Sequence, residues 1–340
     1  MDIDYKQHVL EALEGNEDFP AVTSVTTTKI IDMMEEVNAR TPEVETDPET
    51  HARLAVSLHE IVGFDSVHPI HDITMNSEVL GCEISEPVAD DRFNIETHPE
   101  TPESILELEV PENFAEKGRF PLFKEYYDAT YEKVGGEVAI LGIVEGPTTA
   151  AGNLLGEEEF MKLFISKPDL TEDILDITTE AVIKGAKALK DFGYDSVEVA
   201  DPTAAPPMVK PDDFHEKIQP HLKEIGNSLG NHDLLHICGP TDPIVEYMDE
   251  CNFPALSVEE ENTIEKTVEI ADSAVCGNVS TTTTLFNGTS KEAYDEAVKA
   301  LEAGVDIVAP ACGIPEDCPK ENLIAMVEAW EDFVSKEYSL

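Results

Sequence analysis

The chain has 340 residues, of which 41% are hydrophobic, and its 72 acidic and 22 basic residues give a formal net charge of −50. The length and apolar content suffice for one large α/β domain with a buried core. Because the acids are spread along the chain, we interpret them as a solvated shell that molar salt would screen, and we hypothesise the cytoplasm of a halophile. Such a surface argues against nucleic acid and anionic membranes as partners, since both require a basic patch.

The first residues, MDIDYKQHVLEALEG, predict an amphipathic helix and lack the basic start and apolar stretch of a signal peptide. No run approaches the roughly 18 apolar residues of a spanning helix, so we expect no membrane insertion. The six cysteines are spread over a long chain, unlike those of a disulfide scaffold, and we expect reduced cytosolic thiols.

Short β-branched runs alternate with helical periodicity along the chain. The runs predicted as strands are FPAVTSV, FDSVHPI, EVAILGIV, SVEVAD, LLHIC, ALSVE, SAVCGNV and VDIVAPA. The predicted helices include residues 46–62, 168–192, 211–229, 241–251, 290–303 and 319–336. Alternating units with nearly continuous apolar strands indicate a parallel sheet, and eight units indicate a closed α/β barrel, the (β/α)8 TIM barrel, as a single domain over residues 1–340.

Residues 72–136 separate the second and third predicted strands and are longer than a plain barrel unit requires. They contain the acidic, proline-containing text SEPVADDRFNIETHPETPES. We interpret them as an inserted lid or hairpin segment, with a disordered acidic loop as the alternative.

Active sites of this fold lie at the carboxyl ends of the barrel strands. One histidine and two cysteines occupy such positions in this sequence. His236 and Cys238 end the fifth predicted strand, and Cys312 ends the eighth. Alternate residues of a strand share a face, so His236 and Cys238 can reach one metal ion. With Cys312 they form a three-ligand set with an open fourth position, as catalytic zinc requires. The alternative is that the cysteines are small buried hydrophobes.

Two further polar residues near these strand ends are weaker candidates. Glu198, on the fourth strand, is considered as a transient fourth zinc ligand, and Cys318 could compete with Cys312. The acids of residues 259–261 follow the sixth strand, but the pattern assigns them no role.

The amino-acid sequence resembles the uroporphyrinogen decarboxylase superfamily and, within it, the methylcobamide:coenzyme M methyltransferases of methanogenic archaea. The resemblance covers nearly the whole chain, including AILGIVEGPTTAAGNLLG, VADPTA, HICGPTDPIVEYMDECNFPALSVEE, VCGNVSTTTTLFNGT and GVDIVAPACGIPEDCPKENLIAMVEA. It implies methyl transfer from a methylated corrinoid protein to the thiol of coenzyme M, with His236, Cys238 and Cys312 matching the zinc motif. Zinc would hold that thiol deprotonated at neutral pH.

The resemblance also implies a site for the sulfonate of coenzyme M. Backbone N–H groups at glycine- and threonine-rich strand ends are the candidates, from Gly146 to Asn153 and from Asn278 to Thr284, with plain turn chemistry as the alternative. Asp201, in VADPTA, matches a recurrent family position and could orient the thiol or a zinc-bound water. Its alternative is a helix or turn cap.

Two other functions remain open from the sequence. A porphyrinogen decarboxylase would need basic groups to bind substrate carboxylates, and the chain has only four arginines, Arg40, Arg53, Arg92 and Arg119. A non-catalytic docking partner for a corrinoid protein, with a structural zinc, would need a fourth protein ligand.

Overall fold

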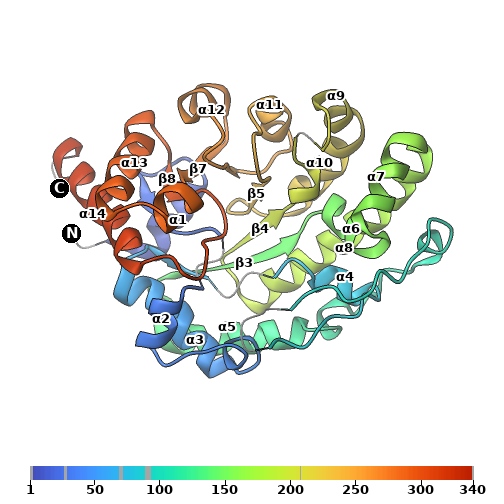
Figure 1. Cartoon of the computed structure of the whole chain (residues 1–340), viewed down its shortest axis with the longest axis horizontal. Coiled ribbons are helices and arrows are strands. Elements are labelled where there is room, and N and C mark those ends of the chain that lie inside the picture. The colour runs from blue at the N-terminus through green and yellow to red at the C-terminus, as the bar shows by residue number, and fades with distance from the viewer. Residues whose placement is uncertain (1–2, 27–28, 69–71, 89–92, 207, 339–340) are drawn as a thin grey trace.

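The computed structural model describes residues 3–26, 29–68, 72–88, 93–206 and 208–338. Eight parallel strands follow one another in the order β1-β8-β7-β6-β5-β4-β3-β2, and helices surround the curled sheet (Figure 1). The strands are β1 (Ala21–Val22), β2 (Ser66–Val67), β3 (Ala139–Glu145), β4 (Ser196–Ala200), β5 (Leu234–His236), β6 (Ala255–Ser257), β7 (Ala274–Val279) and β8 (Ile307–Pro310). The predicted (β/α)8 barrel and all eight predicted strands are confirmed.

Fourteen α-helices lie in the described part of the chain. They are α1 (Tyr5–Leu13), α2 (Ile31–Glu36), α3 (Pro48–Ser57), α4 (Met75–Val79), α5 (Phe120–Val134), α6 (Pro147–Leu155), α7 (Glu157–Ser166), α8 (Pro168–Phe192), α9 (Pro211–Asp213), α10 (Gln219–Ser228), α11 (Val245–Asp249), α12 (Ile264–Ile270), α13 (Ser290–Ala303) and α14 (Lys320–Glu337). None of these helices combines the length and apolarity needed to cross a membrane.

The predicted helices differ from the observed ones mainly where the backbone is interrupted. Helices α8 and α13 have the predicted bounds, whereas the helix predicted over 211–229 is divided by a π-helical turn at Phe214–Ile218. The helix predicted over 241–251 begins only at Val245. Pro243 disfavours the helical conformation in the residue before it, so the helix starts after the proline.

The barrel closes between β1 and β2 through individual hydrogen bonds. The Asp65 N–H donates to the Val22 carbonyl oxygen at 2.8 Å, and the Val22 N–H donates to the Asp65 carboxylate at 2.9 Å. The hydroxyls of Thr23 and Ser66 also bond to each other. Both strands are only two residues long, so these side-chain hydrogen bonds replace part of the backbone hydrogen bonding that joins the other strands.

The barrel interior is filled by small and medium apolar side chains, since alternate residues of each strand point inward. They form one buried cluster that includes Ala139, Leu141, Leu234, Ala255, Ala274, Cys276, Ile307 and Ala309. Polar residues replace them toward the carboxyl ends of the strands. Ala200 pairs with His236, and His236 pairs with Ser257, so these three residues form one inward-facing row.

The segment predicted as an insertion, residues 72–136, contains two different parts. An isolated antiparallel bridge joins Ile84 to Ile95, whereas α5 packs against α3 and buries Phe120, Phe123 and Tyr126. Residues 120–134 are therefore part of the hydrophobic core. The lid or hairpin role remains a prediction, and the residues around the Ile84–Ile95 bridge are its best candidates.

The two ends of the chain meet at the single tryptophan. Trp330, on α14, donates its indole N–H to the Pro20 carbonyl just before β1 and is 4% exposed. Its ring centroid lies 6.4 Å from that of His8 and 6.3 Å from that of Phe19. The last helix is thereby attached to the α1–β1 connection.

A carboxyl pair lies in the connections that lead into β1 and β8. Glu17 lies beside Asp306, whose carboxylate accepts a hydrogen bond from the Val275 N–H at 2.7 Å. Burial, followed by repulsion from Asp306 and a hydrogen bond to it, raises the pKa of Glu17 from 4.5 to about 8, although the Glu17 backbone and His8 oppose this shift. The folded chain therefore holds a proton here at neutral pH.

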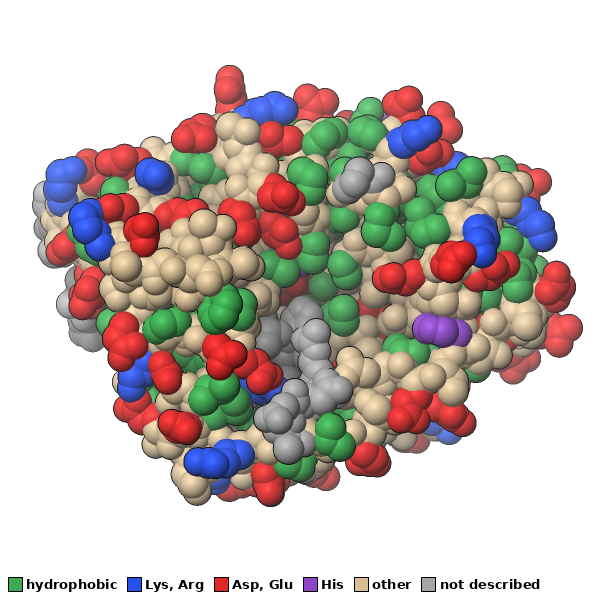
Figure 2. All heavy atoms as spheres, in the orientation of Figure 1, with side chains coloured by type: hydrophobic (Ala, Val, Ile, Leu, Met, Phe, Trp, Pro, Cys, Tyr) green, Lys and Arg blue, Asp and Glu red, His purple; other side chains and the backbone are tan. Residues whose placement is uncertain are grey.

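Acidic side chains are scattered over the face shown in Figure 2, and basic side chains are dispersed among them. We expect the unfolding midpoint to rise strongly between about 0.1 M and about 2 M KCl, because the screening length shrinks to about 3 Å near 1 M and repulsion weakens. Thermal unfolding followed by circular dichroism measures this. Sucrose at equal osmolality is the uncharged control, and a midpoint that ignored KCl would contradict the salt-adapted interpretation.

The Glu17 proton predicts a pH dependence of stability. The unfolded chain releases this proton near its ordinary pKa of 4.5 and the folded chain near about 8, so the free energy of unfolding should fall as pH rises through this window. Glu17→Gln should reduce that fall, which denaturant titrations at several pH values would detect. Asp18→Asn, at an exposed neighbour, is the matched control, and equal pH profiles for both variants would refute this assignment.

Candidate metal centre

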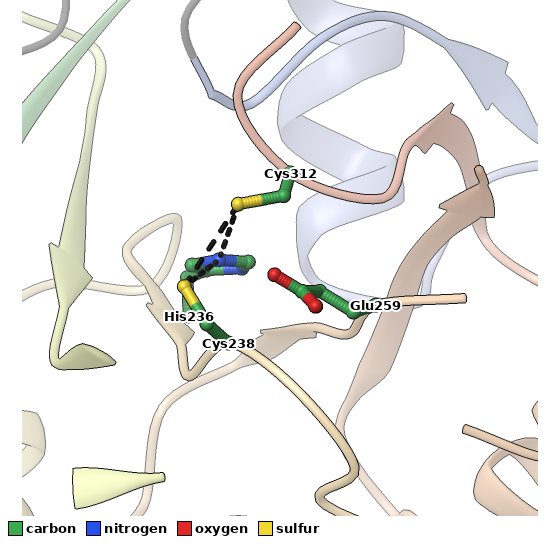
Figure 3. Close-up of side chains that lie close together, drawn as sticks. All are labelled: His236, Cys238, Glu259 and Cys312. Atoms are coloured by element: carbon green, nitrogen blue, oxygen red, sulfur yellow. Dashed lines mark hydrogen bonds between the residues drawn. The ribbon is translucent and has the colours of Figure 1, made fainter. Parts of the chain in front are cut away.

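Four side chains with metal-binding atoms converge at the carboxyl ends of three strands (Figure 3). His236 is the last residue of β5, while Cys238, Glu259 and Cys312 each lie two residues beyond the last residue of β5, β6 and β8. One ligand atom from each of the four residues lies within 4.8 Å of the others. The structure thus brings together the three predicted ligands and adds Glu259.

The fifth strand is shorter than predicted, although the predicted convergence of His236 and Cys238 is observed. The strand ends at His236, so Cys238 lies in the loop that follows. Gly239, with φ of 77°, comes directly after it, and its left-handed backbone is one that glycine adopts readily. The Cys238 thiol reaches the His236 imidazole from this loop.

The separations of the ligand atoms fit a tetrahedral zinc ion. Zinc–sulfur bonds of about 2.3 Å and zinc–nitrogen bonds of about 2.0 Å place two sulfurs about 3.8 Å apart, and a sulfur and a nitrogen about 3.5 Å apart. The two Sγ atoms of Cys238 and Cys312 are 3.8 Å apart. His236 Nε2 lies 3.4 Å from Cys238 Sγ and 3.6 Å from Cys312 Sγ. The three residues therefore form one face of a tetrahedron of the right size.

The imidazole of His236 is oriented by the neighbouring strand. Its Nδ1 lies 3.0 Å from the Ser257 hydroxyl, and this hydrogen bond leaves Nε2 directed at the two sulfurs. Such a bond from the non-ligating nitrogen fixes the ring in most histidine–metal sites. The ring is 1% exposed, so its orientation is also fixed by packing.

The electrostatic environment of this cluster favours positive charge. Burial alone lowers the pKa of His236, but the Cys312 sulfur and nearby carboxylates outweigh it and raise the pKa to about 9. The hydrogen bond with Cys238, together with burial, raises the pKa of the Cys312 thiol. A divalent cation would bind the neutral imidazole and deprotonated sulfur, so its binding would release protons.

Glu259 is the residue that the sequence reasoning placed at the correct strand end without a role. Its carboxylate belongs to the same cluster as the three predicted ligands and points toward His236 (Figure 3). The available signal was its place two residues after β6, which equals the offset of Cys238 and Cys312 from their strands. This common offset can be recognised only when the ends of the strands are known, and the amino-acid sequence does not specify them.

Cys318 and Glu198 lie outside this cluster of four. The Cys318 thiol is buried and donates to the Leu285 carbonyl at 3.2 Å. Glu198 faces the barrel interior in the row beneath His236, and neither of its carboxylate oxygens has a hydrogen-bond partner among the described residues. Burial raises its pKa to about 7, opposed by His236. Glu198 therefore places a second carboxyl group beneath the metal ligands.

Asp201 performs a capping task at the start of α6. Its buried carboxylate accepts hydrogen bonds from the N–H groups and hydroxyls of Thr148 and Thr149, at 2.5–3.3 Å. Burial raises its pKa, and these hydrogen bonds oppose the shift. These four hydrogen bonds satisfy both carboxylate oxygens without a thiol or a water. This agrees with the alternative that Asp201 is a helix cap.

Gly146 is held next to this cap. Its N–H donates to the Ala200 carbonyl at 2.7 Å, and a Cβ added to it would lie 2.4 Å from the Cβ of Asp201. Glycine is thus required by the close approach of Asp201. Because Gly146, Thr148 and Thr149 already donate within the protein, the expectation that their N–H groups hold a sulfonate has no support here.

The other two predicted cofactor-binding residues also bond within the chain. Asn153 Nδ2 donates to the Ile73 carbonyl at 3.2 Å and to the Ser77 hydroxyl at 3.0 Å. Asn278 Nδ2 donates to the carbonyls of Glu259 and Asn262 at 3.2 and 3.4 Å. Only Asn278 is thus connected to the metal cluster, through the backbone of Glu259, and binding of a sulfonate by either residue remains a prediction.

A family model described as uroporphyrinogen decarboxylase (URO-D) matches residues 5–333. The chain belongs to the uroporphyrinogen decarboxylase family. This confirms the resemblance noted in the sequence. The match spans all eight strands and all four members of the metal cluster, so the family relationship applies to the barrel as a whole.

Within this family the similar proteins are methyltransferases. The methylcobamide:CoM methyltransferase MtaA of Methanosarcina barkeri is 38% identical over 332 residues, which cover 96% of this chain and 98% of that protein. The methylcobamide:CoM methyltransferase MtbA of Methanosarcina acetivorans is 29% identical over 319 residues, covering 92% of this chain and 93% of that protein. Both similarities extend over nearly the full length of the two proteins.

Solved structures agree with the fold. A methyltransferase from Methanosarcina mazei superposes with a TM-score of 0.92 at 38% identity, covering 97% of this chain and 98% of that one. A B12-independent methionine synthase from Shewanella has a TM-score of 0.61 at 15% identity, with coverage of 95% and 100%, and shares the fold alone.

The cluster geometry predicts how metal binding responds to loss of one thiol. We expect the wild type to bind about one zinc per chain and Cys312→Ala to lose at least about 100-fold in affinity, since even the loss of a hydrogen bond to a ligand costs about 10- to 100-fold. Competition with a chelating dye measures this. Cys318→Ala removes a buried thiol outside the cluster and should retain wild-type affinity. Equal losses in both variants would contradict the assignment of Cys312.

Proposed function

We propose that this protein is a zinc-dependent methylcobamide:coenzyme M methyltransferase of methanogenesis. It would move a methyl group from a corrinoid bound to a partner protein to the thiol of coenzyme M. The single observation that supports this most is the ligand set of His236, Cys238 and Cys312 at tetrahedral separations. The methyltransferases similar to this chain over nearly its full length add the second support.

The chemistry follows from the ligand set. A zinc ion held by the three residues would act as a Lewis acid that keeps the thiol of coenzyme M as a thiolate at neutral pH. The thiolate sulfur then forms a bond to the methyl carbon, and the electron pair of the broken cobalt–carbon bond stays on cobalt, leaving a cobalt(I) corrinoid. Two sulfurs and one nitrogen from the protein leave a fourth position for the substrate.

The chain's own residues would prepare this site. The Ser257 hydroxyl holds the His236 ring, and the Glu259 carboxylate lies where it can fill the fourth position before the substrate arrives. Beneath them, Glu198 has a pKa of about 7 and can hold a proton at its carboxyl group near neutral pH. The Ser257 hydroxyl and the two carboxyl groups would thus set the charge around the incoming thiol.

The partner would have to be recognised without long-range attraction. At a net charge of −50, an acidic corrinoid protein is repelled, so contact is expected to be short-range and tolerant of salt. Met208, which follows β4, and Phe286, which follows β7, are large apolar side chains with 48% and 36% exposure. They offer apolar contact area after two strand ends. The same charge suits a cytoplasm with molar salt.

The arginines do not favour the decarboxylase alternative. Arg119 is bound by the carboxylates of Asp72 and Glu78, and Arg53 donates to the carbonyls of Val37 and Asn38. These cations are therefore already engaged within the protein. Arg92 lies outside the described residues, and Arg40 is exposed.

The proposal is tested by turnover of methylcobalamin with coenzyme M in molar salt. We expect methyl-coenzyme M to form in the wild type, and kcat/KM to fall at least about 100-fold in Cys312→Ala, since losing a zinc ligand should cost more than losing a hydrogen bond to one. Cys318→Ala should retain activity. Tight zinc binding without turnover of any thiol would favour the docking-partner alternative, and turnover that needs no metal would refute the proposed mechanism.

A further inference from the structure

The side chain of Asn262 joins the two loops that carry Cys238 and Glu259. Its Nδ2 donates to the Gly239 carbonyl and to the Glu259 carbonyl, each at 3.1 Å. Its Oδ1 accepts a hydrogen bond from the Thr241 hydroxyl at 2.9 Å. One amide therefore spans the turn after β5 and the turn after β6.

The partners of this amide determine its orientation. Both neighbours of Nδ2 are carbonyl oxygens, which can only accept, so both amide hydrogens are used. The side chain is buried, at 6% exposure, and water has little access to replace these bonds. Loss of the amide would remove one donor from each of these two carbonyl groups and leave the Thr241 hydroxyl without its acceptor.

The bonds act directly beside the metal ligands. Gly239 follows Cys238, and its carbonyl also accepts from the Thr241 N–H at 2.9 Å. The Glu259 carbonyl receives the backbone N–H of Asn262 at 3.1 Å in addition to the amide. Asn278 adds a hydrogen bond to the same carbonyl at 3.2 Å. The Asn262 side chain thus bonds to the backbone of both turns, and Thr241 and Asn278 donate to the same carbonyl groups.

We propose that Asn262 is a positioning residue of the metal centre. It holds the Cys238 turn and the Glu259 turn at the separation that a tetrahedral ion requires, where distances must be met to about 0.2 Å. This inference rests on the proposed function, because it assumes that the cluster binds zinc. It assigns Asn262 no contact with the metal or the substrate.

The chain contains a closely matched control residue. Asn322 is also buried, at 2% exposure, and its Nδ2 donates to the carbonyls of Leu285 and Gly288 at 2.8 and 3.2 Å. Its Oδ1 accepts from the Ser290 hydroxyl at 3.0 Å. The number and type of bonds equal those of Asn262, but the residues that it joins include none of the four cluster members.

The test compares metal affinity in Asn262→Ala, Asn262→Asp and Asn322→Ala. Zinc dissociation constants come from chelator competition, and cobalt(II) substitution reports geometry through its ligand-field absorption. We expect both Asn262 variants to weaken zinc binding about 10- to 100-fold and to reduce the intensity of the tetrahedral cobalt bands. Asn322→Ala should lose comparable stability while keeping wild-type affinity and spectrum.

A milder variant keeps the test usable if the alanine form does not fold. Thr241→Val removes the hydroxyl donor to Asn262 while both amide hydrogens keep their partners, so we expect a smaller loss of affinity than in Asn262→Asp. Wild-type metal affinity and spectrum in folded Asn262→Asp and Thr241→Val would overturn the positioning role and leave the proposed function intact. A wild type that binds no zinc or cobalt would overturn both.

Discussion

The metal cluster depends on the common direction of the strands. Because all eight strands run parallel around one barrel, β5, β6 and β8 end at the same rim, although their sequences are far apart. The pairing of His236 with Ser257 places a ligand beside the hydroxyl that orients it. Cys238, Glu259 and Cys312 then need only two residues beyond each strand to reach the same point. Short extensions from a rigid sheet leave little freedom for the ligands to separate.

The buried acids of the barrel fall into two groups that differ in how they are satisfied. Asp201 is surrounded by donors at the start of α6, where the helix dipole also favours a negative charge. Glu198 has burial without donors, and its pKa rises to about 7. The first group stabilises the loop architecture. Burial destabilises the charged form of Glu198, and a cation bound nearby would reduce that cost.

The positive end of α6 is therefore engaged by an internal carboxylate. An anionic substrate group would have to displace Asp201 from four hydrogen bonds to bind there, although the sequence pattern of glycine and threonine suggested an open anion site. The pattern was correct about the presence of donors. It could not reveal the acceptor, because Asp201 directly follows the next strand, β4, and comes beside α6 through the β3–β4 pairing.

The sequence predicted the barrel, its eight strands and the convergence of His236, Cys238 and Cys312, because each leaves a local signature of apolar runs and strand-end residues. It did not predict where the strands stop, since pairing rather than composition ends β5 at His236 and leaves Cys238 in a turn. Glu259 was missed for the same reason. Its role requires knowing that β5 and β6 are adjacent and in register, which is a property of three-dimensional pairing.

The hydrogen bond from Trp330 to Pro20 gives the protein an intrinsic fluorescent probe. The single indole of the chain connects the last helix to the segment that leads into the first strand, beside the aromatic rings of His8 and Phe19. Its emission therefore senses whether the two ends of the polypeptide are docked. Changes in tryptophan fluorescence therefore report on the contact between α14 and the segment before β1. The candidate metal cluster lies at the other end of the strands and must be followed with a separate probe.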